Sequence, residues 1–271
     1  MTQWLKTKKC LIMGVMNVTP DSFSDGGKLN SLDKALAHAE QLITEGADIL
    51  DVGGESTRPR AQPVGLVEEL DRVIPVIQAL KAEFDIKVSI DTSKAKGMQE
   101  AVAAGVDMLN DVTALSDPDS ISVVANSQLP ICVMHMQGEP RTMQANPEYQ
   151  NVVLEVSEFL VDIAHRCEIA GIKSENIILD PGLGFGKEIE HNLRLLAAVP
   201  DLCRLGYPVL IGGSRKSMLG QLLNRAVDER MPASIALAAQ AALNGAKIVR
   251  VHDVQASYDA VRLVEAVAQY Q

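Results

Sequence analysis

Eight short apolar runs recur along the chain, and they constrain its fold more than any other feature. They occupy residues 11–16, 48–52, 87–91, 107–111, 131–135, 176–180, 208–212 and 247–252. Each run is largely continuous in its apolar character rather than alternating. Short runs of this kind are typical of parallel strands that are buried on both faces of a sheet. The sequence therefore predicts eight buried parallel strands.

Segments with helical periodicity lie between these runs, with apolar residues three and four positions apart. Clear examples span residues 31–46, 65–84, 151–171 and 233–246. One phrase also repeats before three of the runs, as EGADILDVG from residue 45, AGVDMLNDV from residue 104 and NGAKIVRVHD from residue 244. In each phrase the glycine is expected to end a helix and lead into a strand. The pattern indicates a repeated strand and helix unit.

This alternation, in a chain of 271 residues, predicts an α/β fold of the (β/α)8 TIM barrel type, whose usual length is about 250 residues. A doubly wound open sheet is the structural alternative. That fold often carries a glycine-rich fingerprint after its first strand, which GVMNVT at 14–19 does not match. No Pro-rich or Ser-rich linker divides the chain, so we expect a single domain over residues 1–271.

The composition excludes several classes of protein. Hydrophobic residues make up 47% of the chain and charged residues 22%, as in globular proteins. The formal net charge of −10 argues against nucleic-acid binding, which requires a basic surface. No apolar run approaches the ~18 residues that cross a bilayer, and no cleavage site follows the first run. The four cysteines are widely spaced without a metal-binding pattern, so we expect reduced thiols in a cytoplasmic protein.

Polar side chains stand at the ends of all eight predicted strands, and in a barrel these ends carry the chemistry. They are Asn17, Asp51, Asp91, Asn110, His135, Asp180, the segment GGSRKS at 212–217, and the pair Arg250 and His252. A single Asp or Asn at such a position often caps the following helix instead. Because all eight ends are polar, we interpret the mouth of the barrel as a functional site.

Three of these residues form a set of hydrogen-bonding groups. Asp91 and Asp180 would supply carboxylate acceptors, while the amide of Asn110 would supply one acceptor and two donors. Such a set suits a flat heterocycle with an amino-amide edge. The alternative for Asp180 is a helix cap, although the glycine-rich PGLGFG that follows indicates a wide loop.

The last two strand ends have the features of an anion site. Barrels frequently bind phosphate after strands seven and eight, and Lys216 and Arg250 supply positive charge there. Arg250 and His252 alternate along one strand, so both should point to the same face. The alternative is that Arg215 and Lys216 are solvated residues in the first turn of a helix, where cations oppose the helix dipole.

The remaining histidines carry no such signal. We expect a structural role for His135, which has no alternating partner. His38 and His165 fall inside amphipathic helical segments, and His191 falls at the start of one, so surface or capping roles are expected for these three.

The first predicted strand leads into an unusual loop. GVMNVTPDSFSDGG at 14–27 places Asn17, Asp21 and several small polar residues around Phe23. One interpretation is a surface turn. The other is a mobile loop that supplies ligands and closes over an active site.

Together these segments resemble the dihydropteroate synthase family over essentially the whole length of the chain. The resemblance rests on seven motifs in order: GVMNVTPDSFSDGG (14–27), DVGGESTRP (51–59), VSIDT (88–92), NDV (110–112), DPGLGFGK (180–187), GGSRKS (212–217) and RVHDV (250–254). Each motif alone is modest evidence, whereas all seven in order are highly specific.

The resemblance implies a transferase of folate biosynthesis that requires Mg2+. It would join 6-hydroxymethyl-7,8-dihydropterin diphosphate to p-aminobenzoate, giving 7,8-dihydropteroate and diphosphate. By the same resemblance, the pterin is held by Asp91, Asn110, Asp180 and Lys216. The diphosphate is held by Asn17, Arg250 and His252, with the Asn17 oxygen on Mg2+. The aminobenzoate pocket, where sulfonamides compete in this family, is bordered by Thr57, Arg58, Phe185 and Ser217.

This chemistry predicts a function for the loop at 17–27. Loss of diphosphate would leave a cation on the pterin, which must be kept from water by a closing loop that carries Phe23. Asp21 could stabilise the positive charge, with Lys216, Arg250 and His252 as the other catalytic candidates. No strong general base and no covalent nucleophile are needed.

Two positions depart from the family pattern. Arg60 stands where the family usually has glycine, and the residue before Ser234 is alanine rather than glycine. We expect these changes to alter sulfonamide or aminobenzoate affinity at most. The Ala-rich and Leu-rich segment 233–243 leaves room for a homodimer on the outer helices.

Two rival functions share part of the pattern. Pterin-binding methyltransferases hold a similar heterocycle but have no diphosphate, so the pair of Arg250 and His252 argues against them. A catalytically silent paralogue would bind the pterin without releasing diphosphate. The presence of Asn17 and Lys216 argues against that reading.

Overall fold

The computed structural model describes residues 3–7, 9–18, 28–55, 64–138, 142–144 and 146–270. Eight parallel strands form one sheet in the order β6-β5-β4-β3-β2-β1-β8-β7. A parallel bridge between Leu179 and Val209 joins the two outer strands of this order, so the sheet closes into a barrel. The predicted TIM barrel is confirmed, and the open-sheet alternative is excluded.

All eight predicted strands are present. They are β1 (Leu11–Asn17), β2 (Ile49–Gly53), β3 (Lys87–Asp91), β4 (Met108–Asp111), β5 (Ile131–Met134), β6 (Ile177–Asp180), β7 (Leu210–Ile211) and β8 (Ile248–Val251). Apart from Asn17, all residues of β1, β2, β4, β5, β6 and β7 are buried. They are buried because helices cover the outside of the barrel and side chains fill its inside. This double burial is the reason for the continuous apolar runs.

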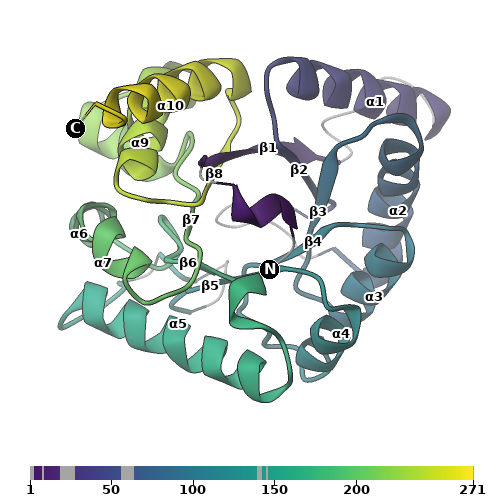
Figure 1. Ribbon diagram of the computed structural model, residues 1–271, viewed down its shortest axis with the longest axis horizontal. Helices are drawn as coiled ribbons and strands as arrows, with labels where there is room; N and C mark the ends of the chain where they lie inside the picture. The colour runs from purple at the N-terminus through teal and green to yellow at the C-terminus, as the bar shows by residue number, and fades with distance from the viewer. Residues whose placement is uncertain are drawn as a thin grey trace.

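A ring of helices surrounds the strands (Figure 1). In chain order they are α1 (Lys28–Thr44), α2 (Leu66–Glu83), α3 (Ala95–Ala103), α4 (Ser120–Ser127), α5 (Val152–Ile169), α6 (Ile189–Ala197), α7 (Val199–Cys203), α8 (Ser217–Leu223), α9 (Met231–Leu243) and α10 (Val254–Ala268). Short 3-10 helices occur at η1 (Gln3–Lys6), η3 (Ser174–Asn176) and η4 (Val227–Glu229). None of the helices in the described ranges combines the length and apolar character that a membrane span requires.

The glycines of the repeated phrase end helices as predicted. Gly46, Gly105 and Gly245 have φ values of 101°, 95° and 96°, in the left-handed region that glycine adopts without strain. In each case the residue after the glycine donates its backbone N–H back into the last helical turn. The chain then turns directly into β2, β4 or β8.

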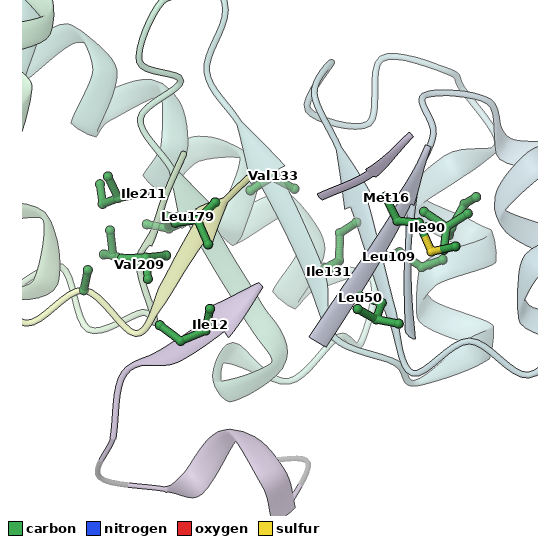
Figure 2. Packing of buried hydrophobic residues seen from close by; sticks show 14 of the residues in the cluster. Ile12, Met16, Leu50, Ile90, Leu109, Ile131, Val133, Leu179, Val209 and Ile211 are labelled. Atoms are coloured by element: carbon green, nitrogen blue, oxygen red, sulfur yellow. The ribbon is translucent and has the colours of Figure 1, made fainter. Parts of the chain in front are cut away.

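Alternation along the strands creates two cores. Outward-facing residues such as Ile12, Leu50, Leu109 and Leu179 pack against the helices in one large cluster (Figure 2). Inward-facing residues form a second, smaller cluster inside the barrel: Leu11, Met13, Ile49, Met108, Cys132, Ile178, Leu210 and Ile248. Leu5 of η1 joins this inner cluster, and η1 lies near the centre of the barrel in Figure 1. The inner apolar layer closes the bottom of the barrel, so any ligand must enter from the other end.

Candidate active site

Polar side chains stand directly above the inner apolar layer. Asp51, Asn110, Asp180 and Arg250 each follow an inward-facing apolar residue by two positions on the same strand. Because strand side chains repeat with a period of two, all four also point into the barrel. The carboxyl ends of the strands thus carry a polar floor, as the polar strand ends predicted.

One register row runs across four neighbouring strands at this level. Asn17 pairs with Gly53, Gly53 with Asp91, and Asp91 with Asn110. A side-chain carbon placed on Gly53 would lie 3.6 Å from Asp91 Cβ and 3.9 Å from Asn17 Oδ1. Glycine therefore leaves open the space between the Asn17 amide and the Asp91 carboxylate.

Arg250 is held by two buried carboxylates. Its Nε donates to Asp51 Oδ2 at 2.7 Å, and its terminal nitrogen donates to Asp91 Oδ2 at 3.0 Å. Asn110 Nδ2 donates to the same Asp51 oxygen at 3.0 Å. Burial by itself would lower the pKa of Arg250, but attraction to Asp51 and Asp91 outweighs it and raises that pKa above its ordinary value. The guanidinium is a permanent cation at the mouth of the barrel.

The two carboxylates predicted to hold a heterocycle are both buried. Burial raises the pKa of Asp91 to about 7, against the opposing attraction of Arg250. Burial also raises the pKa of Asp180, while Lys216 and the backbone N–H of Gly182 oppose that rise. Gly182 donates to Asp180 Oδ1 at 2.7 Å, so Asp180 orders its own loop. It does so with one oxygen, and it caps no helix, because α6 begins at Ile189 with Glu188 as its N-cap.

The two adjacent cations of the 212–217 segment point in different directions. Arg215 is exposed and forms an ion pair with Asp253. Lys216 turns inward, where its amine donates to the carbonyl of Leu183 and lies 4.3 Å from the centroid of the Phe185 ring. Burial lowers the pKa of Lys216 to about 8, with Asp180 opposing the change. Arg215 is therefore exposed beside Asp253, whereas Lys216 lies beside Phe185, and its role in the site stays a prediction.

The other predicted residues lie around this floor. His252 Nδ1 is 3.1 Å from the hydroxyl of Ser214, and its backbone N–H donates to the same hydroxyl at 3.2 Å. Phe185 is buried against Met134 and Met143. Ser217 is exposed at the first position of α8. The predicted residues Asp21, Phe23, Thr57 and Arg58, together with Arg60, lie outside the described residues.

Several buried polar residues were not assigned a role from the sequence. Asp51 was recognised as a strand end, but its bonds to Arg250 and Asn110 join residues far apart in the chain. Asp111 accepts from the backbone of Thr113 and Leu115 and so orders the loop after β4. Lys187 is buried behind the loop after β6. The only signal in the sequence for Asp111 and Lys187 was their position inside two of the seven motifs, NDV (110–112) and DPGLGFGK (180–187).

The fold and this polar floor define a class: a barrel enzyme whose open end binds a heterocycle beside an anion. Comparison with known proteins agrees, because the chain belongs to the pterin binding enzyme family, which matches residues 13–252. The curated relatives place it among the dihydropteroate synthases, which are transferases of folate biosynthesis. The synthase of Haemophilus influenzae is 51% identical over 266 residues, covering 96% of this chain and 97% of the relative. The synthase of Escherichia coli (strain K12) is 50% identical over 255 residues, covering 94% and 90%.

Solved structures give the same result. The Yersinia pestis dihydropteroate synthase with a sulfonamide drug complex has a TM-score of 0.91 at 47% identity, covering 96% of this chain and 95% of the other. The Xanthomonas albilineans dihydropteroate synthase in complex with 7,8-dihydropteroate has a TM-score of 0.88 at 45% identity, covering 96% and 94%. The same Xanthomonas protein has also been solved with 4-aminobenzoic acid, with a TM-score of 0.91. The family resemblance predicted from the seven motifs is confirmed.

Proposed function

We propose that this protein condenses 6-hydroxymethyl-7,8-dihydropterin diphosphate with p-aminobenzoate, releasing diphosphate and forming 7,8-dihydropteroate. The observation that carries the proposal is the buried floor of the barrel mouth. It combines carboxylates, an amide and the Lys216 amine for the heterocycle with the permanent cation of Arg250 for the leaving group. A related synthase binds 7,8-dihydropteroate, which supports the assignment of the product.

The pterin would bind to Asp91, Asn110, Asp180 and Lys216. Buried carboxylates accept the paired N–H groups of an amino-amide edge, and the Asn110 amide can present both a donor and an acceptor. Asp180 Oδ2 lies 3.8 Å from a side-chain carbon placed on Gly212, so the missing side chain there leaves this oxygen accessible. The Lys216 amine would supply a cation above the opposite side of the ring.

The diphosphate would bind to Asn17, Arg250 and His252, and Mg2+ would assist. Within the described residues no group of three or more His, Cys, Asp or Glu could hold a metal. Mg2+ is usually held by few protein ligands and keeps several waters, with substrate phosphates supplying other oxygens. The half-buried Asn17 amide oxygen, open toward Gly53, is such a ligand. When bound, the metal would neutralise charge on the departing diphosphate.

Phe185 and Ser217 would border the aminobenzoate, together with Thr57 and Arg58. Phe185 presents a buried aromatic wall beside Lys216, which suits a flat arylamine. A related synthase binds 4-aminobenzoic acid, which supports the choice of second substrate. Phe23 would belong to the loop that closes over the site, and Asp21 would stabilise the cation.

The reaction would proceed by cleavage of the exocyclic C–O bond before attack by the amine. Arg250 and His252 would stabilise the departing anion, and the buried carboxylates of Asp91 and Asp180 would stabilise positive charge on the pterin. The arylamine would then form the new C–N bond and lose its proton to water. Burial of the floor keeps competing water away from the cation.

We further propose that the chain is one cytoplasmic domain that forms a homodimer. All eight strands share one sheet, which supports a single domain. Exposed apolar side chains occur on consecutive elements late in the chain: Leu222 and Leu223 of α8, Val227 of η4, and Met231 and Leu243 of α9. Covering such a set is a common reason for self-association. Sedimentation of the purified protein tests this directly.

The function is tested by measuring diphosphate release with each component omitted in turn. Release should require the pterin diphosphate, p-aminobenzoate and Mg2+, with dihydropteroate formed in equal amount, and EDTA should abolish it. Tight pterin binding without release would instead identify a silent paralogue. Activity that persists in EDTA would remove the metal from the proposal.

A further inference from the structure

The loop between β6 and α6 is seated on the segment that follows β5. Gly182 has a φ of 68°, and a side-chain carbon there would lie 1.9 Å from the carbonyl oxygen of His135. Gly186 has a φ of 60°, and a side-chain carbon there would lie 2.3 Å from the carbonyl oxygen of Gln137. Only glycine allows the two backbones to approach so closely. The loop that carries Phe185 therefore has a defined position against the segment after β5.

A buried amine supports this loop from behind. Lys187 Nζ lies 2.9 Å from His135 Nδ1, 3.3 Å from the His135 carbonyl oxygen and 3.0 Å from the Phe185 carbonyl oxygen. An ammonium has three N–H donors, which matches these three acceptors. The residue is only 3% exposed, and among the described residues no carboxylate lies within ion-pair distance of it. Burial lowers the pKa of Lys187 to about 7, although the more distant Asp180 opposes the change.

His135 is suited to accept from this amine. Its ring is buried and packs edge-on against Phe159, with ring centroids 4.9 Å apart. Burial, followed by the nearby Lys187, lowers the pKa of His135 to about 3, so the ring is neutral. When Lys187 is an ammonium it can only donate, so Nδ1 then accepts and the ring proton lies on Nε2. The structural role predicted for His135 is thus to accept a hydrogen bond from Lys187 and to pack against Phe159.

The same loop is held from the opposite side by Lys216. That amine donates to the carbonyl of Leu183 and lies over the Phe185 ring. Leu183 and Phe185 are two residues apart, so two lysines hold alternate carbonyls of one loop. Lys216 belongs to the proposed substrate site, whereas the hydrogen bonds of Lys187 within the described residues go to His135 and Phe185.

We propose that Lys187 is a positioning residue that sets the place of Phe185 and so shapes the aminobenzoate half of the site. This inference rests on the proposed function. The pterin floor is built from Asp91, Asn110 and Asp180, which are strand residues held by the sheet itself. Phe185 stands in the loop five positions after the end of β6 and depends on loop contacts for its place. Loss of the Lys187 bonds should therefore affect one substrate and not the other.

The first test compares Lys187→Met with Lys173→Met, a control at an exposed lysine before the same strand. In Lys187→Met the KM for p-aminobenzoate should rise about five- to tenfold, a range that corresponds to the net loss of about one ordinary hydrogen bond. The KM for the pterin diphosphate should change less than about twofold. Lys187→Gln keeps two N–H donors and should give an intermediate KM, and Lys173→Met should match the wild type.

A second test does not depend on catalysis. Hydrogen exchange of the loop peptide 181–188 should be faster in Lys187→Met than in the wild type, with unchanged exchange in β3 and β4. Lys187→Met removes a buried charge but also leaves its three acceptors without this donor. These two effects on stability oppose each other, so the thermal unfolding midpoint should stay within a few degrees.

The outcomes separate the two proposals. Equal rises in both KM values, or a loop whose exchange does not change, would overturn the role of Lys187. A wild type that forms no dihydropteroate would refute the proposed function, while the exchange experiment would still decide whether Lys187 holds the loop. If Lys187→Met does not fold, Lys187→Gln carries both tests.

Discussion

Asp51 is the residue whose substitution tests the architecture of the site most directly. It is fully buried, and its Oδ2 accepts from Arg250 Nε at 2.7 Å and from Asn110 Nδ2 at 3.0 Å. Its other oxygen is buried and has no hydrogen-bond partner among the described residues. Asp51→Asn keeps the shape of the side chain and removes the charge, so it breaks the ion pair without opening a cavity.

The magnitude of the effect follows from the burial of the pair. Removing one partner of a buried ion pair costs about 3–5 kcal/mol, because the other charge stays buried without compensation. Arg250 retains Asp91 at 3.0 Å, and its side chain is 22% exposed, so we expect the lower end of the range, about 3 kcal/mol. For a domain of this size, this corresponds to a fall in the unfolding midpoint of roughly 6–12 °C.

The assay is a double-mutant cycle in thermal unfolding. Asp51→Asn, Arg250→Met and the double variant are compared with the wild type, and the double variant should be more stable than the sum of the single effects predicts, by about 1–3 kcal/mol. Glu190→Gln provides a control at the exposed pair with Arg194, where we expect about 0.5 kcal/mol or less. Additive effects in the cycle, or an Asp51→Asn effect as small as the control, would refute the reasoning.

Three other predictions follow from the site. Asp91 gains a proton below its pKa of about 7, and Lys216 loses one above its pKa of about 8. The initial rate at low pterin concentration should therefore be bell-shaped in pH. Lys216→Arg should remove the alkaline limb of this profile. A rate that is flat from roughly pH 5 to 9.5 would contradict this assignment. Asp180→Ala should weaken pterin binding by about 1–3 kcal/mol in calorimetry, whereas Asp117→Ala should affect only stability, because Asp117 accepts from the backbone of Ala95 outside the mouth. Gly182→Ala should disrupt the loop after β6 and cost about 2–4 kcal/mol, since the new carbon would lie 1.9 Å from the His135 carbonyl oxygen; unchanged thermal stability would show that the loop can move.

Much of the fold was predictable because its signals are local. A strand buried on both faces must be apolar throughout, and a helix that turns sharply into a strand needs a residue at positive φ. Both requirements are visible in short stretches, which is why eight strands and the glycines Gly46, Gly105 and Gly245 could be placed from sequence. Alternation along the last strand also predicted that Arg250 and His252 would point to the same face. The seven motifs identified the family because each is a short local stretch and all seven occur in order along the chain.

Tertiary structure alone decided which polar residues meet. Nothing in the local sequence distinguishes Arg215 from Lys216, yet one pairs with Asp253 outside the site and the other turns inward over Phe185. Asp51 and Arg250 are 199 positions apart and share a bond only because β8 pairs with β1, which in turn pairs with β2. The support of the β6–α6 loop by Lys187 likewise requires β5 and β6 to be neighbours. The sequence by itself determined the elements and the residues at their ends, because those depend on local burial and backbone conformation, whereas the pairing of charges depended on closure of the sheet.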